Sequence, residues 1–154
     1  MKARDIMVTD FPVVSVKTPI RDAVQMLRKN FGDESYLNAA PGLVVLNEKG
    51  ELAGILSPLT IIEAMLDVAG KTGSSALTGP AFLEELCDKI KDKLVEDIMD
   101  WQSISVTEDA AVLDVAALFA QNRFQRIPVV KNKEVIGIIY RSRLLFAMAS
   151  CLLK

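Results

Sequence analysis

The sequence predicts an α+β protein built from two copies of one β-α-β-β-α unit. Three observations carry this prediction. The triplet D-I-M at residues 5–7 recurs at residues 97–99, and GILSPLTIIEAM at 54–65 recurs as GIIYRSRLLFAM at 137–148. Between these landmarks, each copy contains a helical apolar stripe and then short β-branched runs. Several patterns duplicated in one order indicate an internal structural repeat.

Each copy begins with a short alternating segment, VSV at 14–16 and ISV at 104–106, which predicts a strand. A core-facing helix follows, because apolar residues recur at helical spacing: Ile20, Ala23, Val24 and Leu27 in the first copy, and Val112, Val115, Ala116 and Phe119 in the second. Two strands separated by polar turns come next, at 42–47 and 127–130 and then around Gly54 and Gly137. A second apolar helix closes each copy. Such a small sheet buries little surface alone, so we expect the two copies to pack on each other.

The predicted domain boundaries follow from the repeat: a first unit at 1–68, a linker at 69–93 and a second unit at 94–154. The linker opens with AGKTGSS, a flexible composition, and ends in an amphipathic helix that starts at Pro80. The apolar face of this helix is predicted to contain Leu83, Leu86, Cys87, Ile90 and Leu94. We expect the helix to dock on one repeat or on a partner chain. The first unit also carries an extra segment, 31–41, that the second lacks.

Composition excludes several function classes. The chain has 18 basic and 20 acidic residues, so nothing favours bulk binding to nucleic acid or anionic lipid. It has no histidine, which removes the usual zinc site and the commonest general base, so neither a metal site nor an enzyme is expected. Cys87 and Cys151 are predicted to be buried, reduced thiols. The longest apolar run, 144–153, is too short to span a bilayer, and a cytoplasmic protein is expected.

The order and duplication of these motifs resemble a tandem pair of CBS domains, the family named after cystathionine β-synthase. The resemblance rests on D-I-M before the first strand, on RIPVV at 126–130, and on the turn at 54–61 and 137–144, which stands where the family has G-h-h-S/T-x-x-D-L and keeps its frame but not its Asp. It implies two repeats related by a pseudo-twofold axis, with two clefts between them, and commonly a homodimer. Family members often bind adenine nucleotides or adenosyl compounds and regulate a partner. A regulatory module is therefore expected, with no required cofactor and with AMP, ADP, ATP or S-adenosylmethionine as candidate ligands.

In the family pattern, the turn into the last helix places a Ser or Thr near phosphate and an Asp, three residues later, on the ribose hydroxyls. The first repeat keeps Ser57 but has Thr60 in place of the Asp, so ribose capture should be weakened there. Ser57 has a second reading as a simple helix N-cap before Pro58. The second repeat has Tyr140 and Arg143 at these positions, and arginine cannot accept the hydrogens of a diol.

The second repeat instead gathers four arginines, at 123, 126, 141 and 143, in two loops expected near one cleft, where they would attract an anion. The competing reading places Arg141 and Arg143 on a solvated helix face and Arg126 as a brace for its strand. The full set of candidate ligand contacts is an apolar group, Phe11, Val13, Val14, Ser103, Ile104 and Pro128, and a polar group, Ser57, Thr60, Arg126, Tyr140, Arg141 and Arg143.

Two functions remain open from the sequence. One is a sensor of a small anionic or adenosine-containing ligand that signals to a partner protein. The other is a ligand-free interaction or dimerisation module, in which segments 31–41 and 80–93 carry the partner contacts. Trp101 follows the second D-I-M and either shields a cleft or pads a dimer contact.

Overall fold

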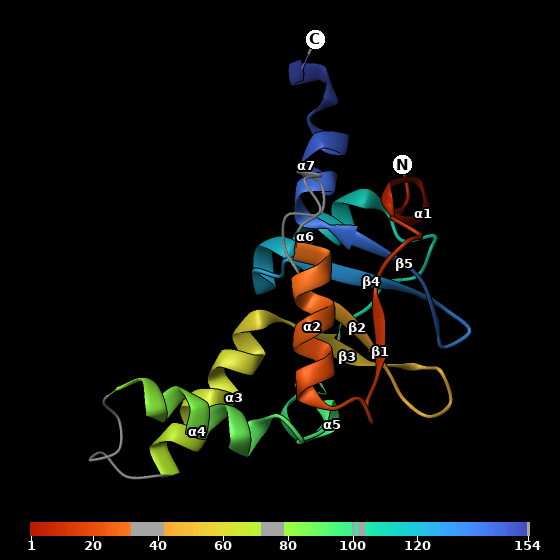
Figure 1. The fold of residues 1–154 in the computed structure, drawn as a ribbon. Helices are drawn as coiled ribbons and strands as arrows, with labels where there is room; N and C mark the ends of the chain where they lie inside the picture. The colour runs from red at the N-terminus through yellow and green to blue at the C-terminus, as the bar shows by residue number, and fades with distance from the viewer. Residues whose placement is uncertain (32–41, 72–78, 100, 102–103, 154) are drawn as a thin grey trace.

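The computed structural model describes residues 1–31, 42–71, 79–99, 101 and 104–153. The elements of the first half are α1 (Ala3–Ile6), β1 (Val13–Ser15), α2 (Ile20–Phe31), β2 (Leu43–Leu46), β3 (Leu52–Leu56) and α3 (Pro58–Lys71). Those of the second half are α4 (Pro80–Ile90), α5 (Val95–Ile98), α6 (Val112–Asn122), β4 (Arg126–Lys131), β5 (Glu134–Tyr140), α7 (Arg141–Met148) and the 3₁₀ helix η3 (Ser150–Leu153). The α+β class is confirmed, and Figure 1 shows the two small sheets with helices against them.

The two sheets are unequal. In the first, β1 runs parallel to β2 and β2 runs antiparallel to β3, so the order is β1-β2-β3. In the second, β4 and β5 form an antiparallel pair. The strand predicted at 104–106 is reduced to one parallel bridge, in which Val106 donates to the Pro128 carbonyl oxygen at 3.0 Å and accepts from the Val130 N–H at 2.8 Å. Ile104 lies at a pocket and outside this ladder.

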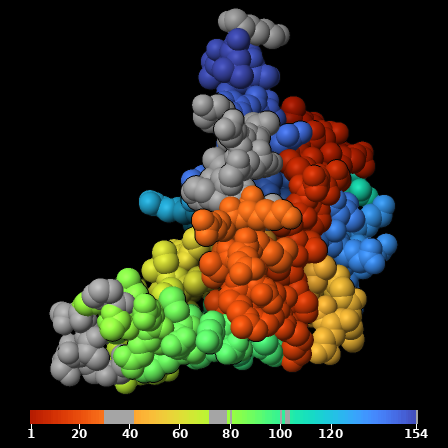
Figure 2. Space-filling view, in the orientation of Figure 1, coloured from red at the N-terminus to blue at the C-terminus, as the bar shows by residue number. Residues whose placement is uncertain are grey.

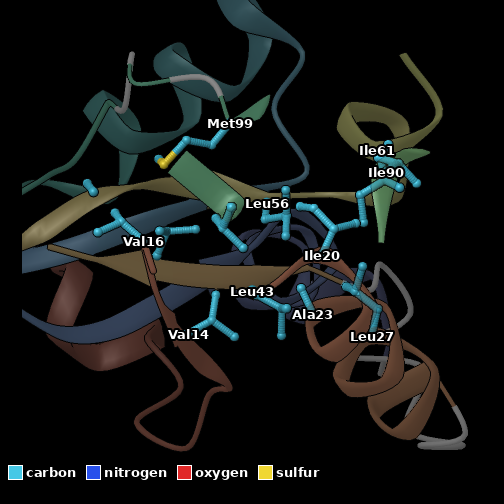
Figure 3. Packing of buried hydrophobic residues seen from close by; sticks show 13 residues of the cluster. Val14, Val16, Ile20, Ala23, Leu27, Leu43, Leu56, Ile61, Ile90 and Met99 are labelled. Atoms are coloured by element: carbon cyan, nitrogen blue, oxygen red, sulfur yellow. The ribbon is translucent and has the colours of Figure 1, made fainter. Parts of the chain in front are cut away.

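The core of the first repeat lies between its sheet and α2, as predicted from the helical stripe. Ile20, Ala23 and Leu27 are buried together with Leu43 and Leu56 from the strands (Figure 3). Val24, predicted to face the core, is 42% exposed because α2 contacts the sheet along a narrower stripe. The second repeat has an equivalent core around Val115, Phe119 and Ile127.

The opposite faces of the two sheets meet each other. Successive side chains of a strand point to opposite faces, so Val45 enters the core of its own repeat while Val44 joins a cluster between the repeats. In β5, Ile139 likewise enters its own core, and Ile138 and Tyr140 join Val44. The expected packing of one repeat on the other is thus made by alternate strand residues.

The short helices that carry D-I-M are exchanged between the repeats. Ala3 of α1 donates its N–H to the Ala110 carbonyl oxygen at 2.8 Å and is buried in the core of the second repeat. Val95 of α5 donates to the Thr18 carbonyl oxygen at 2.9 Å and is buried in the core of the first. Figures 1 and 2 show the N-terminal segment, in red, against the blue strands of the second repeat. Each repeat therefore depends on a segment from the other part of the sequence.

The aspartate of each D-I-M triplet closes the turn of its helix. Asp5 accepts a hydrogen bond from the Lys2 N–H through Oδ2 at 2.8 Å, and Asp97 accepts one from the Leu94 N–H at 2.8 Å. These N–H groups lack partners within so short a helix, and a carboxylate near a helix N-terminus is also favoured by the helix dipole. The duplication of this Asp is explained by local structure.

The linker differs from its prediction at several points. Helix α3 continues to Lys71, where a salt bridge from Lys71 Nζ to Asp67 at 3.3 Å supports its last turn, so residues 69–71 are helical. Helix α4 begins at Pro80 as predicted and packs on α3. Its buried residues are Leu86 and Ile90, whereas Leu83 is 59% exposed, so the buried face is narrower than the predicted one.

Both cysteines are exposed, and the prediction that they are buried is wrong. Cys87 lies on the outer side of α4, beside the buried stripe, and Cys151 lies in η3. Helix α4 covers α3 with one edge only, so a residue at the margin of its apolar face stays in solvent.

Candidate functional site

A pocket of about 430 Å³ lies between the two repeats. Its volume falls within the roughly 300–1,000 Å³ typical of small-molecule sites. The described lining residues from the first repeat are Ile55, Ser57, Leu59, Thr60 and Glu63. Those from α5 and the second repeat are Ile98, Ile104, Arg123, Phe124, Gln125 and Arg126. One wall is therefore the beginning of α3, and the other contains the loop before β4.

The α3 wall is organised by a cap. The Ser57 hydroxyl oxygen accepts the Thr60 N–H at 3.3 Å, and the two hydroxyl groups lie 3.2 Å apart. Pro58 at the first helical position has no N–H to satisfy, which makes Ser57 a favourable N-cap. The N-cap reading of Ser57 is therefore confirmed, and the same hydroxyl also lines the pocket.

Arg126 forms the cationic part of the opposite wall. It is the first residue of β4, pairs in register with Tyr140, and is only 8% exposed. Burial lowers the pKa of its guanidinium, and the neighbouring Tyr140 partly opposes this effect. Arginine starts from so high a pKa that it keeps its charge at neutral pH. The pocket thus contains a charge that is largely removed from water.

The backbone of the first repeat leaves room for Arg126. A methyl group built on Gly42, just before β2, would overlap the Arg126 guanidinium, so a larger residue there would require the arginine side chain to shift. Arg126 consequently touches both repeats, through Gly42 on one side and through its pairing with Tyr140 on the other.

Arg123 adds a second cation in an uncommon backbone conformation. It follows the last turn of α6 with φ 55° and ψ 36°, the left-handed region that helices usually end with glycine or asparagine. Its N–H donates to the Phe119 carbonyl oxygen at 2.9 Å, and its side chain is exposed at the pocket. Its positive charge suits the C-terminus of α6, which carries the negative end of the helix dipole, while its left-handed backbone would favour glycine.

The predicted arginine cluster is divided between two places. Arg123 and Arg126 line the pocket, whereas Arg141 is not among its described lining residues and donates to the side-chain oxygen of Gln125, which is one of them, at 2.9 Å. Arg143 points elsewhere: its Nε donates to the Ile6 carbonyl oxygen at 3.0 Å and ties α7 to α1. The exchange of α1 into the second repeat provides this carbonyl, and no sequence pattern indicates it.

Among the predicted apolar contacts that the structure describes, only Ile104 lines the pocket. Val14 is buried in the first core, Val13 is 40% exposed on β1, and Phe11 joins Tyr140 in the cluster between the sheets. Pro128 is fully buried within β4, and Ser103 lies outside the described residues. Tyr140, which replaces the hydroxyl residue of the family turn, packs against Val44 and Ile138 and is 8% exposed. Trp101 is 55% exposed.

Glu63 is the lining residue that sequence reasoning missed. It follows Thr60 by three positions on α3, so both side chains lie on the same side of the helix. Helical spacing from the turn could have identified it. A second hollow of about 270 Å³ shares Thr60, Glu63 and Ile98 with the pocket and continues toward Asp67 and Lys93.

The described residues offer neither a metal-binding cluster nor a membrane-spanning helix. Within the described residues, no three histidine, cysteine or carboxylate side chains are grouped so that they could hold a metal ion. Across the same part of the chain, no helix combines the length and apolar character needed to cross a membrane.

Comparison with known proteins agrees with the duplicated fold. The CBS domain family model matches residues 3–67 and 95–150. Uncharacterized protein YlbB of Bacillus subtilis is 30% identical over 139 residues, covering 90% of this chain and 76% of that protein. CBSX1, a chloroplastic CBS domain-containing protein of Arabidopsis thaliana, is 26% identical over 147 residues, and the match covers 90% of this chain but only 59% of that protein.

Solved structures show the same architecture. A CBS domain-containing protein of unknown function from Kribbella flavida superposes with a TM-score of 0.74 at 29% identity, covering 97% of this chain and 99% of that one. CBSX2 in complex with AMP gives 0.70 at 24% identity, covering 98% of both chains. The cytosolic domain of the Mg²⁺ channel MgtE in complex with ATP gives 0.66 at 21%, covering 95% of this chain and 48% of that one. With two matched segments that correspond to its two repeats, the chain belongs to the CBS domain family as a tandem pair.

Proposed function

We propose that this CBS pair is a non-catalytic regulatory module that binds a small, anionic, adenosine-containing ligand in the pocket between its repeats. The observation that carries the proposal is the juxtaposition of Arg123 and Arg126 with the hydroxyl-lined start of α3 across one pocket. A buried guanidinium and a helix N-terminus both favour an anion such as phosphate. Apolar neighbours, Ile55, Ile98 and Ile104, would cover a flat base. AMP and ATP complexes of CBSX2 and MgtE, which share the fold, support this ligand class.

Arg126 would transmit ligand binding from the pocket to both repeats. A phosphate that draws its guanidinium into the pocket would change the packing against Gly42 and the edge of β5 at Tyr140. The ligand can bias the setting of the two repeats only by as much as its affinity differs between the two settings. We propose that a partner protein, in the cytoplasm, responds to this setting. In this function the module needs no cofactor and binds no nucleic acid.

A thermal-shift panel of AMP, ADP, ATP, S-adenosylmethionine, adenosine and inorganic phosphate tests this function, with wild type and Arg123→Gly compared. At a hundred times its dissociation constant, a ligand adds about 2.7 kcal/mol to the free energy of unfolding, or about 5 to 10 °C in midpoint. Arg123→Gly relieves a left-handed backbone, so the free protein should gain up to about 1 kcal/mol. The same variant should bind phosphate-bearing ligands more weakly than wild type and should bind adenosine with unchanged affinity.

A flat response of the wild type to every compound at millimolar concentration would contradict the sensor function. It would favour the second candidate, a ligand-free interaction module. The observation that motivates this alternative is Tyr140, whose side chain packs in the cluster between the sheets at the place of the second repeat's ligand turn.

We also propose that the module forms a homodimer through α3 and α7. Both helices leave apolar side chains in solvent at equivalent places in the two repeats: Ile62 is 52% exposed and Leu145 is 57% exposed, and Leu66 of α3 is 66% exposed. These are the outer halves of the apolar faces whose inner residues, Ile61 and Leu144, are buried. Two like helices related by the internal repeat suit a self-complementary contact with a second copy.

Sedimentation velocity measures this state. The wild type should sediment with the mass of two chains at micromolar concentration, and Leu66→Glu combined with Leu145→Glu should sediment as one chain. Leu113→Glu on α6, where the side chain is 68% exposed, is the matched control and should remain dimeric. A monomeric wild type, or a Leu113→Glu variant that dissociates equally, would refute the proposed interface.

A further inference from the structure

Glu63 brings a carboxylate to the pocket from the second turn of α3. Among the residues described at the pocket, it is the acidic one, and it faces a wall that carries Arg123 and Arg126. Its side chain is exposed, and no hydrogen bond or ion pair within the described part of the chain holds the carboxylate. The pocket is therefore dipolar, with two cations on one side and an anion on the other.

The neighbouring hydroxyl groups cannot replace this acceptor. Ser57 Oγ already accepts the Thr60 N–H, and the Ser57 and Thr60 hydroxyls share a hydrogen bond at 3.2 Å. Neither hydroxyl carries charge, whereas a carboxylate has two oxygens and forms hydrogen bonds roughly twice as strong as those of neutral acceptors. Glu63 is the group at this wall best suited to receive two hydrogens from a ligand.

The charge of the pocket decides which donor fits. Two arginines and one glutamate leave a positive lining, which disfavours a ligand group that is itself cationic. A neutral group with two adjacent hydroxyls meets both carboxylate oxygens without opposing the arginines. An anion attached to that group then reaches the arginine wall.

We propose that Glu63 is a specificity-determining residue that accepts the hydrogen bonds of a vicinal diol, so that the pocket selects ribose-bearing phosphates over their deoxy analogues. This role rests on the proposed ligand function and adds the residue that binds the sugar hydroxyls. The sugar contact would then lie at Glu63, one helical turn further along α3 than Thr60, which occupies the position of the family's aspartate.

Isothermal titration calorimetry with AMP and 2′,3′-dideoxy-AMP tests this role. The wild type should prefer AMP by about a hundredfold or more, since the dideoxy compound lacks both hydroxyls and each hydrogen bond to a charged group contributes roughly 1.5–3 kcal/mol. Glu63→Ala should bind AMP as weakly as the wild type binds the dideoxy compound, and it should no longer distinguish the two. Asp67→Ala is the matched control: Asp67 lies one turn further along α3 and lines the neighbouring hollow, so this variant should keep the wild-type preference.

The outcomes separate the two levels of proposal. Failure of the wild type to bind AMP would overturn the role of Glu63, and failure to bind any adenosine-containing compound of the panel would overturn the ligand function as well. Binding of AMP without preference over the dideoxy compound, or a preference that survives in Glu63→Ala, would overturn the role of Glu63 alone. An equal loss of preference in Asp67→Ala would do the same, because it would show that the overall charge of α3, and no specific contact, selects the ligand.

Discussion

Replacing Arg126 by methionine should remove the thermal shift caused by phosphate-bearing ligands and leave the stability of the free protein within about 1 kcal/mol of wild type. The guanidinium is 8% exposed at the pocket wall, so burial opposes its charge in the absence of ligand. A methionine of similar length fills the same space without that desolvation cost. Loss of a largely buried cation from an anion site typically weakens binding by about 2–5 kcal/mol.

The comparison needs a second arginine that lies outside the pocket. Arg143 holds the Ile6 carbonyl oxygen, so Arg143→Ala should lower stability slightly and keep the full ligand-induced shift. Calorimetric titration of both variants with AMP and adenosine measures the difference. If Arg143→Ala loses phosphate binding and Arg126→Met keeps it, the anion site lies in another place than the described pocket.

Truncating Leu56 to alanine should cause the largest loss of stability, about 2–5 kcal/mol. Leu56 is fully buried at the end of β3, where it pairs with Leu43 and contacts the core of the first repeat. The cavity left by the missing methyl groups adds to the lost hydrophobic transfer, and the cap residue Ser57 follows directly in sequence. The thermal midpoint should fall by about 5 to 20 °C.

Urea unfolding gives the corresponding free energy. Leu113→Ala serves as the control, because Leu113 is 68% exposed and its truncation should change stability by less than about 0.5 kcal/mol. A loss below 1 kcal/mol for Leu56→Ala, or equal losses in the two variants, would show that the core of the first repeat is not packed as described.

Much of the fold could be predicted because the patterns that define it are local. The stripe of Ile20, Ala23 and Leu27 has helical spacing, and the structure buries all three. Pro80 begins α4 as predicted, because its ring fits the first turn of a helix. The duplication supports each predicted helix and strand, because the same apolar pattern occurs at the equivalent position in both repeats. The predictions failed at margins: Val24 and Cys87 lie beside buried stripes, and only the shape of the neighbouring element decides how wide a stripe is covered.

The site was predictable only in part, because it joins residues that are distant in sequence. The turn into α3 was identified from Ser57 and Thr60, and Arg126 was identified as a cation of the opposite repeat. The sequence indicated four arginines near one cleft, and the structure separates Arg143 from the pocket by giving it the Ile6 carbonyl. Glu63 was not identified from the sequence, because its neighbours Ile62 and Ala64 are apolar and its position at the pocket depends on which residues lie opposite α3.

The sequence by itself determined the duplicated unit, the order of its elements and the central buried positions of α2 and α6, because periodicity and composition encode which face of each element is buried. Only the tertiary structure decided that α1 and α5 exchange repeats, and it also paired the start of α3 with the loop before β4. Such choices depend on which apolar surfaces remain uncovered once the local elements have formed. The protein buries them by packing one sheet of each repeat against the other, and the pocket lies where the two repeats meet.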